Sequence, residues 1–318
     1  MHFTTLVAVG SALLLNLSEA ARLPNKHHGD ALEYRTVETF KHPGAMHTED
    51  DMRRWRNLVG QQQEPWYTAF NHLKASKLAQ VTWKATPQVL LVRGANNKTT
   101  QNYGYAYRDA HSAYQQAILW HVTGNDSYAA AATKTLNGWA NSLVGIDGNE
   151  DMFLAAGLYG YQFANAGELL RGYSGWAADS VEAFGTMLNN VFAKYNRLFL
   201  ETQNGKPDFY YANWDFCNIA SLMAIGIFND NATMYNSAVA YFRDGSPSGA
   251  VANGALPFFS IANFTEEGTG KTLMQGQEAG RDQGHALLDF ALLGVIGWQG
   301  YNQGVDTFAF FGNQILNG

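Results

Sequence analysis

The sequence has few of the features that bind nucleic acids or cross-link small domains. It contains one cysteine in 318 residues, so no intrachain disulfide can form. Only 15% of the residues are charged and no Lys/Arg cluster stands out, which argues against a nucleic-acid partner. With 46% hydrophobic and 14% aromatic residues, the chain has the composition of a folded globular protein. Cys217, inside FCNIASLMAIGIF, is expected to be a small core residue.

Long apolar runs are nearly absent as well. The single one, residues 3–17, is too short for a comfortable membrane span and is followed by small residues. It predicts a signal peptide over residues 1–21, and hence a secreted protein with no membrane partner. Sequons at Asn97, Asn125, Asn231 and Asn263 fit a glycoprotein. We assign residues 22–40 to an N-terminal extension and residues 41–318 to one domain.

Helical periodicity dominates the rest of the sequence. Thr48, followed by three acidic residues, predicts a helix to about Val59, and Pro65 suits the first turn of the next helix. Further helices are expected at about 109–123, 127–143, 151–171, 176–199, 214–228, 231–243, 281–297 and 304–316. Short turns join them in pairs that recur about every 40 to 50 residues. The pattern therefore predicts antiparallel helical hairpins, stacked in a solenoid or closed into a ring.

Two polar, glycine-containing stretches, residues 81–108 and 244–280, interrupt this pattern. Loops of this length in a compact domain are usually functional, so we expect at least one to line a cleft. The segment around Gly268–Thr272 lacks the first glycine of a phosphate-binding loop. The acidic stretch 147–151 lacks the spacing and closing glutamate of a calcium-binding EF-hand. No metal site is predicted from these motifs.

Two segments contain the residue types that chemistry requires. YYANWD, residues 210–215, opens an apolar helix, and QGQEAGRDQGH, residues 275–285, enters another. Arg281 and His285 are four apart, so on a helix they would share one face. A capped helix with Arg281–Asp282 pairing at the surface would explain the second segment without any function, and this alternative stays open on spacing alone.

Several short motifs resemble those of a known family. They are HPGAMHTEDDMR (42–53), EPW (64–66), WHVTGNDSY (120–128), NAGELLR (165–171), NWD (213–215) and QGQEAGRDQGH (275–285). From about residue 40 onward, the sequence resembles the alginate-lyase-like family of polysaccharide lyases, and QEAGRDQGH is its most specific element.

The resemblance implies an all-α fold, an incomplete or complete (α/α) toroid of antiparallel hairpins. It also implies a lyase that cleaves an anionic uronate polysaccharide, of the alginate or glucuronan type, by β-elimination. We expect the protein to act as a monomer. Because family members continue through further helices, we expect the domain 41–318 to be C-terminally truncated and to expose an apolar seam.

Such a lyase must neutralise the substrate carboxylate, remove the C5 proton and protonate the leaving oxygen. We expect Asn213 and Arg281 to neutralise, His285 to be the base and a tyrosine, first Tyr211, to be the acid. The expected substrate-binding residues are Gln277, Glu278, Gln283, Trp214, His111, Tyr105 and Tyr107; Trp214 fits a core position equally well. No metal or organic cofactor is required, because Arg281 and Asn213 supply the stabilisation that a cation would give.

Two alternatives stay open at this point. An inverting glycoside hydrolase on an (α/α) toroid would need two carboxylates about 6.5–9.5 Å apart, for which Asp215, Glu278 and Asp282 are available. A non-catalytic glycan-binding protein would bind without turnover. An amide, a guanidinium and an imidazole beside these acids favour the lyase, whose substrate is anionic.

Overall fold

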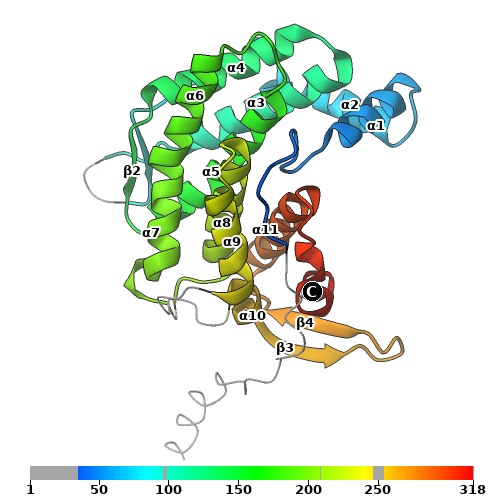
Figure 1. The fold of residues 1–318 in the computed structure, drawn as a ribbon, viewed down its shortest axis with the longest axis vertical. Helices are drawn as coiled ribbons and strands as arrows, with labels where there is room; N and C mark the ends of the chain where they lie inside the picture. The colour runs from blue at the N-terminus through cyan, green and yellow to red at the C-terminus, as the bar shows by residue number, and fades with distance from the viewer. Residues whose placement is uncertain (1–34, 96–98, 208, 246–253, 318) are drawn as a thin grey trace, which may run out of the picture. The chain divides into compact units, whose positions relative to one another are not determined.

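The computed structural model describes residues 35–95, 99–207, 209–245 and 254–317. Residues 36–318 belong to one compact unit. The expected signal peptide and the sequon at Asn97 lie outside the described residues. Within the unit, the predicted all-α class is confirmed: helices make up most of the described chain, and the strands beside them are short (Figure 1).

The inner layer of the unit consists of α3 (Tyr103–Thr123), α5 (Asp151–Leu170), α8 (Asn213–Phe228) and α11 (Gln283–Asn302), each packed on the next. α5 and α8 are buried over most of their length, as their apolar sequences require. Glycine allows the close approach of these two helices. A Cβ atom on Gly160 would lie 2.1 Å from Ser221 Oγ.

The outer layer returns the chain after each of the inner helices α3, α5 and α8. α4 (Asp126–Ser142) follows α3, and α9 (Ala232–Asp244) follows α8. After α5, α6 (Ala178–Met187) continues through a π-helical stretch, Leu188–Ala193, into α7 (Lys194–Thr202). α4 and α6 lie side by side (Figure 1). These inner–outer pairs are the helical hairpins that the sequence predicts.

The inner helices α3, α5 and α8 run in the same direction. Along α5, Gly157 faces Cys217 and Gly167 faces Phe228, so the two helices advance together. α3 and α5 also run in the same direction. Tyr103, at the start of α3, stacks on Tyr159 in the first half of α5, and His121, near the end of α3, donates to the Leu169 carbonyl near the end of α5. The N-termini of these helices therefore gather at one end of the layer and their C-termini at the other.

A segment that we call the strap, residues 36–47, crosses the C-terminal ends of the inner helices. Side-chain amides bond its backbone; they belong to Asn165, Asn236, Asn302 and Gln303. The buried Glu168 carboxylate accepts from Gly44 N at 3.1 Å and lies 2.7 Å from His42 Nδ1. The strap leads into α1 (Glu49–Gly60), which begins at a capping box on Thr48, and then α2 (Trp66–Ala75).

The two expected loops contain strands that periodicity did not predict. β1 (Leu90–Arg93) pairs in parallel with β2 (Gly145–Gly148), with Leu90 opposite Gly145. After the short helix α10 (Ala255–Phe259), β3 (Ser260–Thr265) and β4 (Thr272–Gly276) form an antiparallel hairpin that projects beyond the helices (Figure 1). Strands of four to six residues are too short for a clear alternation of apolar and polar residues.

Three helix predictions need correction. α3 begins at Tyr103, six residues earlier than expected, and α11 begins at Gln283 rather than 281. The helix expected at 304–316 is wrong: short turns replace it, η4 (Thr307–Ala309), α12 (Phe310–Asn313) and η5 (Gln314–Asn317). Positive φ values at Phe311 and Gly312, 52° and 70°, break the helical path there.

Leu287, Trp298 and Tyr301 are large apolar side chains of α11 that are exposed. In the portion of the chain that the structure describes, no helix combines the length and apolar character needed to cross a membrane.

Candidate active site

Asn213 is buried at the first position of α8. The chain reaches it through Ala212, whose φ of 55° is unfavourable for a residue with a Cβ atom. Ala212 provides no side-chain cap for the helix. The Asn213 Nδ2 atom lies 3.5 Å from Glu278 Oε1. A strained backbone that presents a buried amide is a common feature of functional sites.

The turn between β4 and α11 brings Glu278 and Arg281 to this amide. Glu278 is buried, whereas the Arg281 side chain is 55% exposed. Arg281 Nη1 donates to Glu278 Oε1 at 3.1 Å, the same oxygen that Asn213 faces. The structure thus joins residues that are 65 positions apart in sequence, and it leaves the guanidinium accessible to an anion from solvent.

His285 is oriented by the acid that caps its own helix. Asp282 Oδ1 accepts from the His285 backbone N–H at 2.9 Å, and Asp282 Oδ2 lies 2.6 Å from His285 Nδ1. These hydrogen bonds lower the pKa of Asp282. A neutral His285 that donates from Nδ1 keeps its lone pair on Nε2, where a base needs it. Arg281 precedes this helix, so the predicted shared helical face with His285 is wrong.

Asp289, one turn further along α11, is fully buried beside the same group. Burial, and then the charge of Glu278, raise its pKa to about 7 against the opposing effects of the Asn213 amide and backbone N–H and the charge of Arg281. We did not predict this residue as part of the site. Its signal in the sequence was a single acid within the otherwise apolar run ALLDFALLG.

The other predicted residues of these segments lie at varied depths. Tyr211 is half-buried two residues before Asn213, and its ring meets Phe258 edge-on at 5.9 Å. Trp214 stacks on Phe199 at 5.9 Å and packs on Tyr210, which favours its core role. Gln277 is half-buried and Gln283 is exposed.

A second group lies at the start of α3. Tyr105 and Tyr107 are exposed there, 43% and 37%. His111 is exposed as well, and partial burial lowers its pKa. Nothing in the structure joins these three side chains to Asn213 by a direct contact within the described ranges. They line the same end of the inner layer, because α3 and α8 are parallel.

Arg93, at the end of β1, is a cation of this group that sequence reasoning missed. Its guanidinium lies 5.3 Å from the Tyr103 ring centre and 5.8 Å from that of Tyr159, and Nη1 donates to Tyr159 Oη at 3.1 Å. Burial raises the pKa of the Cys217 thiol, and the charge of Arg93 opposes that rise. Arg93 therefore acts electrostatically on the first turns of α8. Arg93 lies in a stretch that the sequence predicts as a loop, where no helical or strand periodicity indicates which side chains face the site.

Helix N-termini add positive potential at this end. Each carries roughly half an elementary charge from its unpaired N–H groups, and parallel inner helices place several of these ends together. With Arg93 and Arg281, they add positive charge at this end beside the acids Glu278 and Asp282, in a protein of net charge -6. Among the residues that the structure describes, no group of three or more His, Cys, Asp and Glu side chains is arranged to hold a metal ion.

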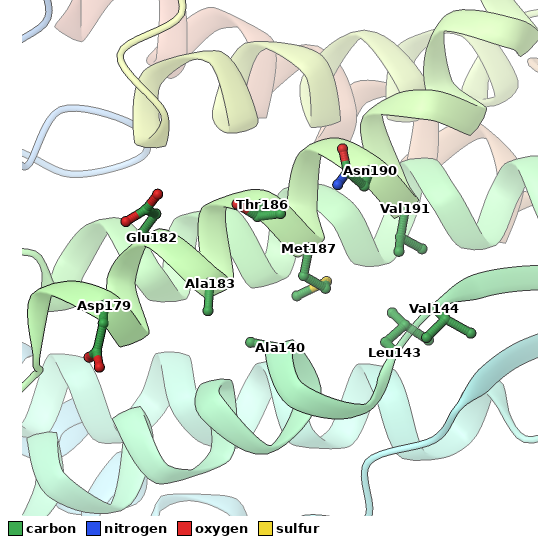
Figure 2. A pocket seen from close by; sticks show the side chains of 10 residues that line it. All are labelled: Ala140, Leu143, Val144, Asp179, Glu182, Ala183, Thr186, Met187, Asn190 and Val191. Carbon is green, nitrogen blue, oxygen red and sulfur yellow. The ribbon is translucent and has the colours of Figure 1, made fainter.

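A hollow of about 510 Å³ lies elsewhere, on the outer layer between α4 and α6 (Figure 2). Asp179 and Glu182 line it together with apolar residues such as Leu143, Met187 and Val191, and no cation contributes to its lining. An anionic ligand would find only repulsion there. The candidate site at the N-terminal end of the inner helices is therefore identified by its side chains, the Asn213 amide, the Arg281 guanidinium and the His285 imidazole, and not by this hollow.

The hairpin fold and this amide–guanidinium–imidazole group define an (α/α) toroid protein with a site suited to an anionic sugar polymer. A family model described as alginate lyase matches residues 60–261, which is more than half of the chain. The chain belongs to the alginate lyase family. It is accordingly a polysaccharide lyase, and its substrate is an anionic polysaccharide.

Solved structures agree in fold. An alginate lyase A1-III variant complexed with a tetrasaccharide is similar with a TM-score of 0.63 and 15% identity, over 88% of this chain and 76% of that one. Alginate lyase A1-III from Sphingomonas species A1 is similar with a TM-score of 0.54 and 15% identity, over 82% of this chain and 71% of that one. An alginate lyase from Bacteroides ovatus is similar with a TM-score of 0.53 and 7% identity, over 85% of this chain and 79% of that one. Among curated protein sequences, none matches the chain.

Proposed function

We propose that the protein is a secreted lyase that cleaves a uronic-acid polymer of the alginate or glucuronan type by β-elimination. The observation that carries this proposal is the group formed by the Asn213 amide, the accessible Arg281 guanidinium and His285 oriented by Asp282. An amide and a guanidinium suit a carboxylate, and an imidazole with a free Nε2 suits proton removal.

The reaction follows from the roles of these groups. Asn213 and Arg281 bind the uronate carboxylate and stabilise the extra charge that develops on it when C5 loses its proton. His285 Nε2 takes that proton. The electron pair left on C5 forms the C4–C5 double bond, the C4–O bond breaks, and the departing oxygen takes a proton from Tyr211. The products are one chain with an unsaturated uronate at its new non-reducing end and one with a free hydroxyl.

Ultraviolet absorbance tests the reaction class, because only β-elimination creates the conjugated unsaturated uronate. The protein would be incubated with polymannuronate, polyguluronate, glucuronan and, as a neutral control, a glucan. We expect absorbance to rise with at least one uronate polymer and not with the glucan. Release of reducing ends without absorbance would instead show hydrolysis, and the proposal would be wrong.

Export and assembly are proposals of the same kind. The apolar run 3–17 supports cleavage near residue 21, so N-terminal sequencing of secreted protein should not begin at Met1. The sequons at Asn125, Asn231 and Asn263 are on exposed residues, which supports their glycosylation. We expect a monomer, and a larger species in size-exclusion chromatography with light scattering would contradict this.

A further inference from the structure

Three buried polar side chains from three helices meet beside the start of α8. Gln203, at the end of α7, donates through Nε2 to Asp215 Oδ1 and, at 2.9 Å, to Tyr241 Oη. Tyr241, on α9, donates to the same Asp215 oxygen at 3.2 Å. All three residues are buried, so the Asp215 carboxylate is out of reach of a substrate. We call Gln203, Asp215 and Tyr241 the clamp.

The clamp acts on the helical turn that carries Asn213. Asp215 lies in the first turn of α8, two residues after Asn213. The chain enters α8 through a tight turn in which Trp214 N donates to the Tyr211 carbonyl at 3.2 Å. The first central residue of this turn, Ala212, has a φ of 55° and a ψ of -115°, which are type II′ values that favour glycine. A residue with a Cβ atom stays in such a conformation only where the surrounding structure holds it there.

Two neighbouring helices hold this turn through the clamp. Gln203 ends α7 and Tyr241 belongs to α9, so a shift of the first turn of α8 against either helix lengthens a buried hydrogen bond. Such a bond is costly to lose, because the buried groups cannot bond to water instead. The clamp is itself formed at a cost: Gln203 has a φ of 49°, and its Oε1 atom has no partner among the described residues. On the other side of the turn, Trp214 stacks on Phe199 of α7 at 5.9 Å.

We propose that the members of the clamp are positioning residues: their hydrogen bonds keep Ala212 in its strained conformation and thereby hold Asn213 and Tyr211 in place for the reaction. This inference rests on the roles of Asn213 and Tyr211 in the proposed function. It gives Asp215 no contact with the substrate, whereas an inverting hydrolase would need it as a reacting acid. Loss of a clamp bond should lower kcat more than it raises KM, because the reacting groups move while the accessible Arg281 still binds the polymer.

Tyr241→Phe is the first test, because it removes one hydroxyl and keeps the ring. With the uronate polymer that the wild type cleaves, initial rates by ultraviolet absorbance should give a kcat lowered by about tenfold. Asp215→Asn keeps an oxygen acceptor for both donors, so its kcat should stay within about threefold of the wild type. Asp215→Ala removes the acceptor and should lower kcat by about 10². Circular dichroism would check that each variant is folded, and the first two variants decide the test if Asp215→Ala is not.

Tyr235→Phe is the matched control. Tyr235 is a buried tyrosine of the same helix, α9, but its hydroxyl donates to the backbone carbonyl of Gln299 on α11 at 3.3 Å. Each substitution removes one buried hydroxyl, so thermal melts should show a lower Tm in both variants. Only Tyr241→Phe should lower kcat.

Ala212→Gly tests whether the clamp acts through the strained turn. Glycine adopts a φ of 55° readily, so the turn needs less support from its neighbours. In this background Tyr241→Phe should lower kcat by about threefold instead of tenfold. A measurement without substrate is amide hydrogen exchange. The backbone N–H groups of Trp214 and Phe216, which bond within this turn, should exchange faster in Tyr241→Phe and not in Tyr235→Phe.

The outcomes separate the clamp from the lyase reaction. An equal kcat in the two Tyr→Phe variants, or independent effects of Tyr241→Phe and Ala212→Gly, would overturn the inference while the lyase function stands. If Asp215→Asn were as inactive as Asp215→Ala, Asp215 would be a reacting acid, and the inference would be wrong as well. No turnover on any uronate polymer would overturn both the inference and the proposed function.

Discussion

The two ends of the inner helix layer are built in opposite ways. At the C-terminal end, the backbone of the strap forms hydrogen bonds with amide side chains. The buried Glu168 carboxylate there binds the His42 ring and accepts from the Gly44 backbone N–H. At the N-terminal end, Ala212 is strained and α8 has no side-chain cap. Asp289 is buried there without an ordinary hydrogen bond among the described residues.

The difference indicates that one end of the layer stabilises the fold and that the other holds the candidate site. At the strap end, hydrogen bonds join the strap backbone to side chains distant in sequence, which is how a fold stabilises itself, although Glu168 Oε2 and the Gln299 amide are also buried without a partner among the described residues. The opposite end holds the amide, guanidinium and imidazole that we propose to act on the substrate, and the strained Ala212 and the unsatisfied Asp289 there reduce stability. Substitutions at the two ends should therefore affect different measurements.

The largest expected effect is on catalysis. His285→Ala should lower kcat by about 10²–10⁴ through loss of proton transfer. Asn213→Ala should lower it by about 10² or more through loss of a preorganised donor. Initial rates by ultraviolet absorbance measure both.

Asn236→Ala provides the matched comparison at the strap end. It removes the amide that exchanges hydrogen bonds with Val37, so it should lower the free energy of unfolding by about 1 kcal/mol and leave kcat unchanged. If Asn236→Ala impaired turnover as much as Asn213→Ala, the two ends would not be separate in function.

The next largest effect is on stability. Glu168→Ala removes a buried acid that lies 2.7 Å from His42 and accepts from Gly44 N at 3.1 Å. We expect the free energy of unfolding to drop by about 2–4 kcal/mol in urea titrations, with kcat/KM retained. Asp230→Asn, which changes the exposed partner of His42, should cost much less. Equal losses in the two variants would contradict the burial argument.

A smaller effect is expected at Arg93. Its guanidinium lies against two tyrosine rings at the site end, so it suits a second carboxylate of the polymer. Arg93→Gln should raise KM about tenfold, and Arg93→Lys should restore this only in part because an ammonium cannot stack. Arg197→Gln, on the exposed side of α7, is the control. A KM unchanged in Arg93→Gln would remove this residue from the binding site.

The sequence predicted the fold better than the site. Apolar residues at helical spacing identified the hairpins, since helices such as α4 and α9 have long periodic faces and Asn caps. The four-residue strands β1 and β2 gave no such signal, because their pairing joins segments more than fifty residues apart. The start of α11 was placed too early because Asp282, its cap, stands inside a run of polar residues.

The sequence named several residues that the structure brings together, but it did not name two of their neighbours. The residues Asn213, Glu278, Arg281 and His285 were named, and the structure joins the first three directly. Asp289 and Arg93 were missed. The burial of Asp289 and the stacking of Arg93 on the Tyr103 ring both depend on which helices become neighbours. Nothing local in a sequence specifies such long-range contacts.

The smallest expected effect is on pH-dependent stability at the strap. Burial alone would lower the pKa of His42, but the hydrogen bond and charge of Glu168 and the hydrogen bond of Asp230 raise it overall, against the charge of Arg171. The folded protein therefore holds a proton on His42 more tightly than the unfolded chain does. This contribution to stability is fully present below the unfolded pKa of about 6.5 and is lost as pH rises through the higher folded value.

The measurement must isolate His42, because other groups titrate nearby. Burial lowers the pKa of His47 to about 4, and that group makes the folded state more stable as pH rises from 4 to 6.5, which is the opposite sign. The contribution of His47 is the same in the wild type and in His42→Gln. It therefore cancels when the free energy of unfolding of His42→Gln is subtracted from that of the wild type. We expect this difference to be larger at pH 5.5 than at pH 9, because protonated His42 bridges Glu168 and Asp230 only at the lower pH. A difference that grows with pH would show that burial, and not the two carboxylates, controls His42.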